Sequence, residues 1–340
     1  MVRRPLSPRT TLTRARFRVA AFAFGASTAS LLRLAAAAAA ADHAGAIAAM
    51  ALGDAAWTRR AEGGDGEGRV PSQTIADAIA AYQLAANEQP DALAPQWKLV
   101  RALHFAADFT TASSDEARTY LDRATRTADA SVERIERRAS EAAVDVGAGA
   151  SQAERLRAAF SAEALPDVVA TYFWSAIAWG SWTRTRGTLA AVREGVAGRL
   201  HNYAELVIAL DPSFEEGGAL RLLARLHATL PRVPLLSGWV DREQALPLME
   251  RALAIAPSHP GNQLLMALTL RELAPTRSNE ANRLLERAAS STPRPAYAAE
   301  DAAIRKEARD QLGRPEPTAG HRRPPVLLLA SGLATGRNHQ

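Results

Sequence analysis

The chain contains no cysteine among its 340 residues. This absence excludes disulfide bonds, thiolate catalysis, cysteine metal sites and lipidation of an N-terminal cysteine. Aromatic residues form only 6% of the sequence, and the β-branched residues that favour strands are also few. Alanine, leucine, arginine and glutamate, which all favour helix, are abundant instead. The composition therefore predicts an all-α protein.

Acidic residues are absent from residues 1–41, which carry seven arginines. Residues 314–340 are basic as well, so the net charge of +5 comes from the two ends, and the body between them has more acids than bases. Nucleic-acid binding depends on clustered cations that release counterions from phosphates. The sequence therefore predicts no nucleic-acid partner.

A short apolar run follows the basic stretch at the N-terminus. It covers residues 19–32 and leads into an alanine-rich exit that ends at Ala41. As a helix this run spans about 21 Å, which is less than the ~30 Å hydrocarbon core of a membrane. The order of basic, apolar and small residues is typical of a secretory signal peptide. We expect export to the periplasm with cleavage near Ala41; the alternatives are an uncleaved anchor and an N-terminal extension of a cytoplasmic protein.

One spacing recurs along the rest of the chain. An alanine, a large apolar residue, a second alanine and a proline follow one another at steps of four, three and five. Three segments show the full pattern, at Ala78/Tyr82/Ala85/Pro90, Ala245/Met249/Ala252/Pro257 and Ala281/Leu285/Ala288/Pro293. Partial copies stand at Ala117/Leu121/Ala124 and at Leu200/Ala204/Val207/Pro212.

The pattern has a physical basis in helix packing. Steps of three and four place the side chains on one helical face, where small alanines let a neighbouring helix approach closely. The proline ends the helix and sets the turn into the next. This is the second-helix half of a tetratricopeptide repeat, and Trp57 and Trp97 stand where the first-helix tryptophan belongs. We predict a tetratricopeptide-like array of stacked antiparallel helix pairs over residues 42–313, followed by a disordered tail over 314–340.

The repeat register lapses after residue 130. Residues 131–143 are predicted to form an exposed charged helix, and residues 147–150 a loop. Residues 167–184 differ, because five aromatic side chains crowd into one predicted helix: Tyr172, Phe173, Trp174, Trp179 and Trp182. This helix is either buried at the centre of the array or lines a ligand groove or partner surface.

Two further positions stand out in the second half of the chain. Arg221 follows Gly217 and Gly218 by one helical turn, where glycine permits the close approach of a backbone or a ligand. It can pair with an acidic residue just before these glycines or contribute to a binding site. Trp239 ends an insert between two predicted helices. The predicted site combines the aromatic helix with these two positions, through Tyr172, Trp174, Trp179, Arg221 and Trp239.

Several of these segments resemble one known family. They are residues 211–218 (DPSFEEGG), 221–227 (RLLARLH), 172–180 (YFWSAIAWG) and 238–241 (GWVD). Together they resemble the T-component family of tripartite ATP-independent periplasmic (TRAP) transporters, over roughly residues 57–312. The resemblance implies a periplasmic helical protein of tetratricopeptide type whose partner is the transporter's solute-binding protein. Members of this family are often anchored by a lipidated cysteine, which this chain does not have.

No catalytic motif is found in the sequence. The seven histidines include no pair at i, i+3 or i+4, and no Gly-x-Ser-x-Gly elbow is present. The glycine-rich residues 63–68 lack the lysine and threonine of a phosphate-binding loop. The sequence therefore predicts a non-enzymatic binding protein without a metal or cofactor. A generic protein scaffold and a carrier of a small apolar ligand are the alternatives, and homo-oligomerisation stays open.

Overall fold

The computed structural model describes residues 44–110, 112–147, 149–234 and 236–314. The predicted signal peptide and the predicted tail beyond residue 314 lie outside these residues. The described residues are helical apart from loops, short 3₁₀ turns and one isolated bridge between Val70 and Thr110, which confirms the all-α prediction. In this part of the chain no helix has the length and apolar character needed to cross a membrane.

The helices follow one another with short connections. The first spans residues 44–58. The others are α2 (Gln73–Glu88), α3 (Leu93–Phe109), α4 (Ser114–Val146), α5 (Gln152–Ala159), α6 (Leu165–Arg186), α7 (Thr188–Arg193), α8 (Val196–Leu210), α9 (Phe214–Thr229), α10 (Ala245–Ile255), α11 (Pro260–Leu273), α12 (Ser278–Ala289) and α13 (Ala298–Leu312). Three 3₁₀ turns are η1 (Arg242–Gln244), η2 (Pro275–Arg277) and η3 (Pro295–Tyr297).

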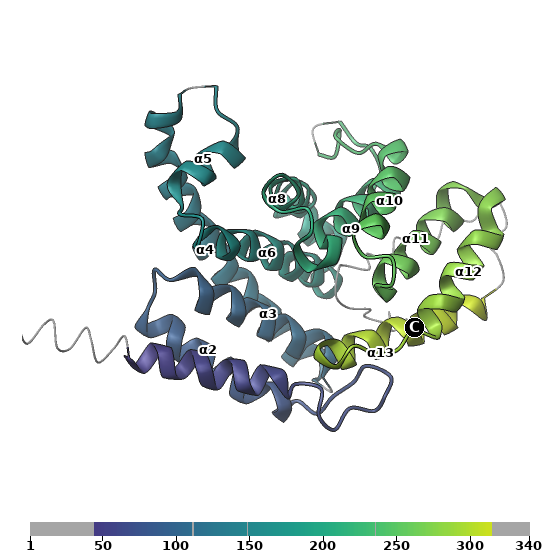
Figure 1. Cartoon of the computed structure of the whole chain (residues 1–340), viewed down its shortest axis with the longest axis horizontal. Coiled ribbons are helices and arrows are strands. Elements are labelled where there is room, and N and C mark those ends of the chain that lie inside the picture. The colour runs from purple at the N-terminus through teal and green to yellow at the C-terminus, as the bar shows by residue number, and fades with distance from the viewer. Residues whose placement is uncertain (1–43, 111, 148, 235, 315–340) are drawn as a thin grey trace, which may run out of the picture. The chain divides into compact units, whose positions relative to one another are not determined.

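Successive helices pack as pairs, as Figure 1 shows along the chain. We call the first members of the pairs the A helices: the helix over residues 44–58, α3, α6, α9, α11 and α13. The second members, the B helices, are α2, α4, α8, α10 and α12. Each B helix packs between the A helices that flank it in sequence, and α3, α6, α9, α11 and α13 also contact one another in that order. This alternation is that of a helical repeat array.

The repeated alanines lie where the spacing predicts. The Ala/large/Ala residues of α2, α10 and α12 are completely buried. Small residues on the partner helix allow the close approach: a side chain at Gly53 would come within 2.5 Å of the Tyr82 ring. The repeat register read from the sequence is therefore confirmed on the three B helices that carry the full pattern.

One predicted segment differs from the structure. Residues 131–143 are not an exposed helix of their own but continue α4, whose first turn is fixed by a capping box between Ser113 and Glu116. Among its many charges, Val132, Ile135 and Ala139 recur at helical spacing and are buried. The long helix is therefore amphipathic, and it packs against α5 and α6.

The last A helix is joined to the end of the first. Arg60, which follows the helix over residues 44–58, makes an ion pair with Glu300 of α13 at 2.7 Å. Its guanidinium also donates to the main-chain oxygen of Ala296. Nearby, a side chain at Gly68 would come within 2.5 Å of the Cβ of Ala303, so the loop over residues 63–68 lies directly against α13. These contacts connect residues about as far apart in sequence as the described chain allows.

Candidate binding surfaces

The first turn of α9 is left-handed. Glu215, Glu216 and Gly217 have φ values of 48°, 55° and 84°, and the first two are the only non-glycine residues with positive φ in the part of the chain that is described. Such conformations cost roughly 1–2 kcal/mol for a residue with a Cβ atom. They persist only where the surroundings hold them, and they cluster at functional sites.

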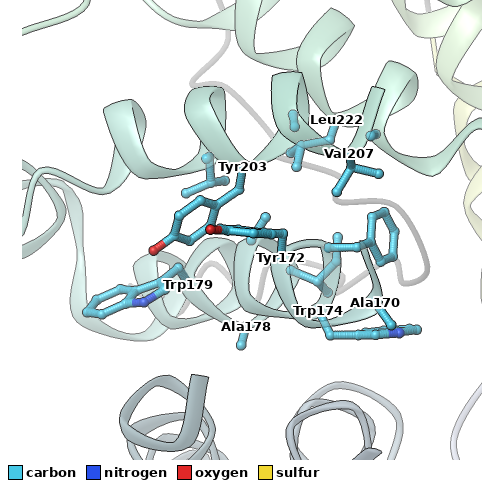
Figure 2. Close-up of a cluster of buried hydrophobic side chains, with 14 of the residues drawn as sticks. Ala170, Tyr172, Trp174, Ala178, Trp179, Tyr203, Val207 and Leu222 are labelled. Atoms are coloured by element: carbon cyan, nitrogen blue, oxygen red, sulfur yellow. The ribbon is translucent and has the colours of Figure 1, made fainter. Parts of the chain in front are cut away.

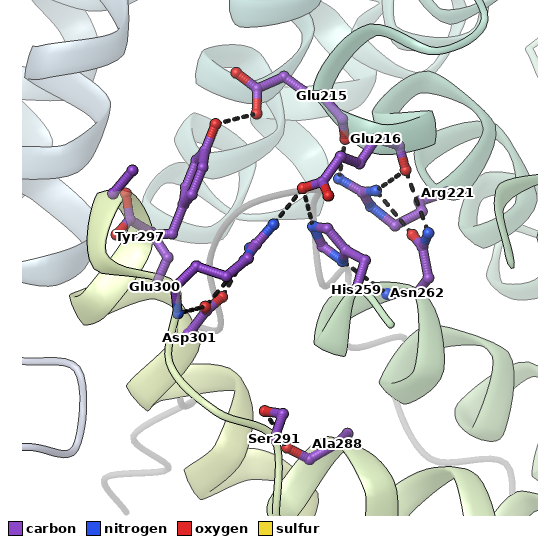
Figure 3. A network of polar contacts seen from close by, with 12 residues as sticks. Glu215, Glu216, Arg221, His259, Asn262, Ala288, Ser291, Tyr297, Glu300 and Asp301 are labelled. Carbon is purple, nitrogen blue, oxygen red and sulfur yellow. Dashed lines mark hydrogen bonds and ion pairs between the residues drawn. The ribbon is translucent and has the colours of Figure 1, made fainter. Parts of the chain in front are cut away.

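Arg221 supplies the support for this turn, as Figure 3 shows. Its guanidinium donates to the carbonyl oxygens of Glu216 at 2.8 Å and of Glu215 at 3.0 Å. Asn262 of α11 accepts a further hydrogen bond from Arg221 at 2.8 Å and donates to the Glu216 carbonyl at 3.2 Å. Arg221 is 1% exposed, and burial lowers its pKa to about 10. The sequence offered a pairing of Arg221 with a neighbouring acidic residue as one alternative. In the structure its guanidinium bonds to the main-chain carbonyls of Glu215 and Glu216, because the turn directs those oxygens toward it.

The carboxylates of the turn reach the C-terminal part of the array. Glu216 makes an ion pair with Arg294 and lies 3.6 Å from Nε2 of His259. Glu215 accepts a hydrogen bond from the Tyr297 hydroxyl at 3.4 Å, and burial raises the pKa of this carboxyl group. The turn thereby links α9 to α11 and to the segment that leads into α13 (Figure 3).

The two glycines that follow have packing roles. A side chain at Gly217 would meet the main chain of Ala252 at 3.2 Å, and one at Gly218 would meet the Phe173 ring at 2.6 Å. The sequence predicted that these glycines permit the close approach of a backbone or a ligand. In the structure, the groups that approach them belong to α10 and α6.

A cluster of cations and aromatic rings lies on the first two A helices. The Arg101 guanidinium is 3.9 Å from the centre of the Trp57 ring and 4.9 Å from that of Trp97. Arg60 covers the same Trp57 ring at 4.1 Å. Trp57, Trp97 and Arg101 are only partly buried, so the cluster borders on solvent. Cations and aromatic rings at such distances attract one another, more strongly where water is excluded.

The aromatic residues of α6 are buried within the array. Tyr172 is inaccessible and packs on Tyr203 of α8, with ring centres 5.3 Å apart, as Figure 2 shows. Trp179 is 5% exposed and donates its indole N–H to Asp129 of α4 at 2.8 Å. Trp174 is 4% exposed, and the centre of its ring lies 6.1 Å from that of His104 of α3. The sequence allowed two interpretations of this helix, burial at the centre of the array or the lining of a groove or partner surface. The structure places these three side chains in the interior.

Trp239 belongs to a different region, the insert between α9 and α10. Its ring stacks on that of His201 of α8, with ring centres 4.0 Å apart, and meets the ring of His227 of α9 edge-on, with centres 5.6 Å apart. The N–H of Asp241 donates to Nδ1 of His227 at 3.0 Å, which fixes the end of the insert. Among the described residues, no ring contact, hydrogen bond or ion pair joins Trp239 to Trp174, and Arg221 is engaged with the first turn of α9 and with Asn262. The structure therefore distributes the five predicted site residues over three local environments.

The described residues of the insert, on either side of residue 235, are hydrogen-bonded to one another and include exposed apolar side chains. Ser237 bridges it, donating to the Pro231 carbonyl at 2.6 Å and accepting from the Val233 N–H at 3.1 Å. Arg232 closes it by donating to the Gly238 carbonyl at 3.0 Å. Leu236, in contrast, is 56% exposed, and Val233 is 37% exposed. The insert therefore presents apolar side chains on a fixed base.

Sequence reasoning did not assign the Trp57, Trp97 and Arg101 cluster to a site. The two tryptophans served only as markers of the repeat, and Arg101 lies one turn after Trp97 on the same helix. That spacing is the signal that was available, since i and i+4 residues share a face. This spacing alone does not indicate a site, because the third member, Trp57, lies on another helix and only the tertiary structure brings it to Arg101.

In comparisons with known proteins, no protein-family model and no curated protein sequence matches this chain. In the described part of the chain, no three histidine, aspartate or glutamate side chains gather in a way that could hold a metal ion.

Proposed function

We propose that this protein is a non-enzymatic binding subunit of a periplasmic TRAP-type solute uptake system, and that it associates with the solute-binding protein. The observation that carries the proposal is the insert between α9 and α10, a loop with a fixed base and the exposed apolar residues Val233 and Leu236. Ordered loops on a rigid scaffold are common recognition elements, and exposed apolar side chains on them favour a protein partner. The resemblance of residues 238–241 and 211–218 to the T-component family supports this choice of partner.

Export is part of the same proposal, because the solute-binding protein works in the periplasm. The basic, apolar and alanine-rich order of residues 1–41 supports it. Mass spectrometry of the protein isolated from its native cell should find an N-terminus near Asp42 in the periplasmic fraction. A cytoplasmic protein that begins at Met1 would contradict both export and this partner.

The partner surface is tested by direct binding. The purified chain and the TRAP solute-binding protein from the same organism are mixed, and their affinity is measured by calorimetry. Leu236→Asp should weaken binding at least tenfold, because it places a charge in an apolar contact. Leu84→Asp is the matched control, since Leu84 of α2 is similarly exposed at 50% but lies outside the insert.

Two results would count against the proposal. One is the absence of measurable binding between the wild-type proteins. The other is an equal loss for Leu84→Asp and Leu236→Asp, which would mean that the insert is not the contact surface. Circular dichroism of both variants verifies that the helices remain folded.

A further inference from the structure

Arg101 differs from the other arginine that stacks on Trp57. Arg60 is fully engaged, with Glu300 at 2.7 Å and the carbonyl of its own helix at Trp57 at 3.2 Å. Arg101 makes no ion pair with any carboxylate of the described residues, and its Nε has no hydrogen-bond partner there. Burial lowers the pKa of Arg101, against the opposing influence of the Tyr82 hydroxyl and the Glu215 carboxyl. A partly buried cation without a close carboxylate is a suitable partner for an external anion that reaches it from the solvent side.

Trp174 adds a second donor beside it. The Arg101 guanidinium lies 5.9 Å from the centre of the Trp174 ring. The indole N–H of Trp174 is buried and has no acceptor among the described residues.

Other tryptophans of the same two helices do have acceptors. The indole groups of Trp97, Trp179 and Trp182 donate to the carboxylates of Asp167, Asp129 and Asp122 at 2.8–2.9 Å. Unmet side-chain N–H groups also occur elsewhere in the described chain, but those of Trp174 and Arg101 lie on neighbouring helices that are in contact, where one acceptor can serve both.

The surroundings define the chemistry of that acceptor. The partly exposed rings of Trp57 and Trp97 flank the guanidinium and offer apolar walls open to solvent. Guanidinium and indole N–H groups are both donors, and a carboxylate supplies two acceptor oxygens in a plane that suits the guanidinium fork. A doubly charged anion is disfavoured, because Arg101 is the one cation of this cluster without a carboxylate partner and the negative Glu215 carboxyl already acts on it.

We propose that Trp57, Trp97, Arg101 and Trp174 form a binding site for a small monocarboxylate with an apolar body. The carboxylate accepts hydrogen bonds from Arg101 and from the Trp174 indole, and the apolar body lies against the solvent-exposed parts of the Trp57 and Trp97 rings. This site goes beyond the proposed association with a solute-binding protein and does not depend on it.

The test uses the full chain and defined probes. Acetate, hexanoate and phenylacetate are each compared with the corresponding uncharged amide, and binding is followed by tryptophan fluorescence and calorimetry. Hexanoate or phenylacetate should bind at least tenfold more tightly than its amide, and acetate should bind more weakly than both. Arg101→Met should weaken carboxylate binding at least tenfold and leave amide binding nearly unchanged.

Two further variants separate the site from a folding effect. Trp174→Phe keeps the ring but removes the N–H, and should weaken carboxylate binding several-fold. Arg123→Met is the matched control, because Arg123 of α4 is also partly buried but bonds to Gln83 away from the site; it should bind like the wild type. Should Arg101→Met fail to fold, Arg101→Lys serves instead, since it keeps the charge but loses the planar fork and should bind several-fold more weakly.

The proposal is overturned if no carboxylate binds more tightly than its amide, or if Arg101→Met and Arg123→Met bind carboxylates alike. Neither result bears on the affinity for the solute-binding protein, which is measured separately with Leu236→Asp. The two proposals can therefore fail independently.

Discussion

Arg221 and Asn262 share one acceptor, the carbonyl oxygen of Glu216, and are themselves joined by a hydrogen bond of 2.8 Å. Asn262 also donates to the carbonyl groups of Ala252 and Ala256 at the end of α10. One buried amide thus connects the end of a B helix with the left-handed start of an A helix. Such a network stabilises a fold when every member is satisfied, and it is costly when one member is removed.

We therefore expect Arg221→Met to destabilise the protein by about 2–4 kcal/mol. The substitution removes the donor to the Glu215 carbonyl and one of the two donors to the Glu216 carbonyl, and it leaves the buried Oδ1 of Asn262 without the hydrogen bond from Arg221. Each unsatisfied buried group costs roughly 1–3 kcal/mol. Arg225→Met is the control one turn later on α9, where the guanidinium is also buried but makes a longer bond of 3.3 Å to Thr269. The free energy of unfolding in urea should fall clearly less for Arg225→Met. Similar losses for both variants would show that burial of the side chain, not support of the turn, sets the cost.

Gly217→Ala should also destabilise the protein, for reasons that involve no lost hydrogen bond. The residue has a φ of 84°, and a Cβ atom there would lie 3.2 Å from the main chain of Ala252. The left-handed conformation alone costs about 1–2 kcal/mol for alanine. Gly198→Ala is the opposite case, because Gly198 lies within α8 with open space around its Cα. That change should stabilise the protein by about 0.5–1 kcal/mol.

Thermal unfolding followed by circular dichroism compares the two glycines directly. The melting temperature should fall for Gly217→Ala and rise for Gly198→Ala. A rise for both would mean that the first turn of α9 does not need its left-handed conformation.

The helix pairs were predictable because their signals are local. The buried positions of Ala252 and Ala288 follow from the large apolar residue three positions before each of them and the proline five positions after. Close packing of two helices requires only that one face carry small apolar residues. The amphipathic part of α4 was missed, since Val132, Ile135 and Ala139 are few among charged neighbours. Their burial depends on the packing of α4 against α5 and α6, which the sequence of α4 alone does not show.

The candidate sites were predictable only in part. Arg221 was identified from its glycine neighbours. The left-handed conformation of Glu215 and Glu216 has no signal in the sequence, because glutamate favours the right-handed helix. The Arg101 cluster was not identified, because it combines residues of two separate helices. The ion pair of Arg60 with Glu300 likewise joins positions 240 residues apart. Aromatic content led instead to α6, whose tryptophans mostly serve packing.

The stability of the protein should depend on pH through His259. This residue caps α11, its Nδ1 accepting from the Asn262 N–H at 3.1 Å, and burial together with Arg221 and Arg294 lowers its pKa to about 2. Glu216, 3.6 Å from Nε2, favours protonation but does not outweigh these effects. His259 is therefore neutral in the folded protein, whereas in the unfolded chain it titrates near pH 6.5.

Because the folded pKa lies below the unfolded one, the stability due to neutral His259 is complete above about pH 6.5 and is lost as the pH falls. The loss is about 1.4 kcal/mol per pH unit, or about 2 kcal/mol between pH 7.5 and 5.0. His259→Asn keeps an oxygen acceptor for the helix cap but removes the titration. Urea unfolding at the two pH values should therefore show a drop about 2 kcal/mol smaller for His259→Asn than for the wild type. Equal drops would mean that His259 takes up a proton in the folded state, and that Glu216 rather than the two arginines controls its charge.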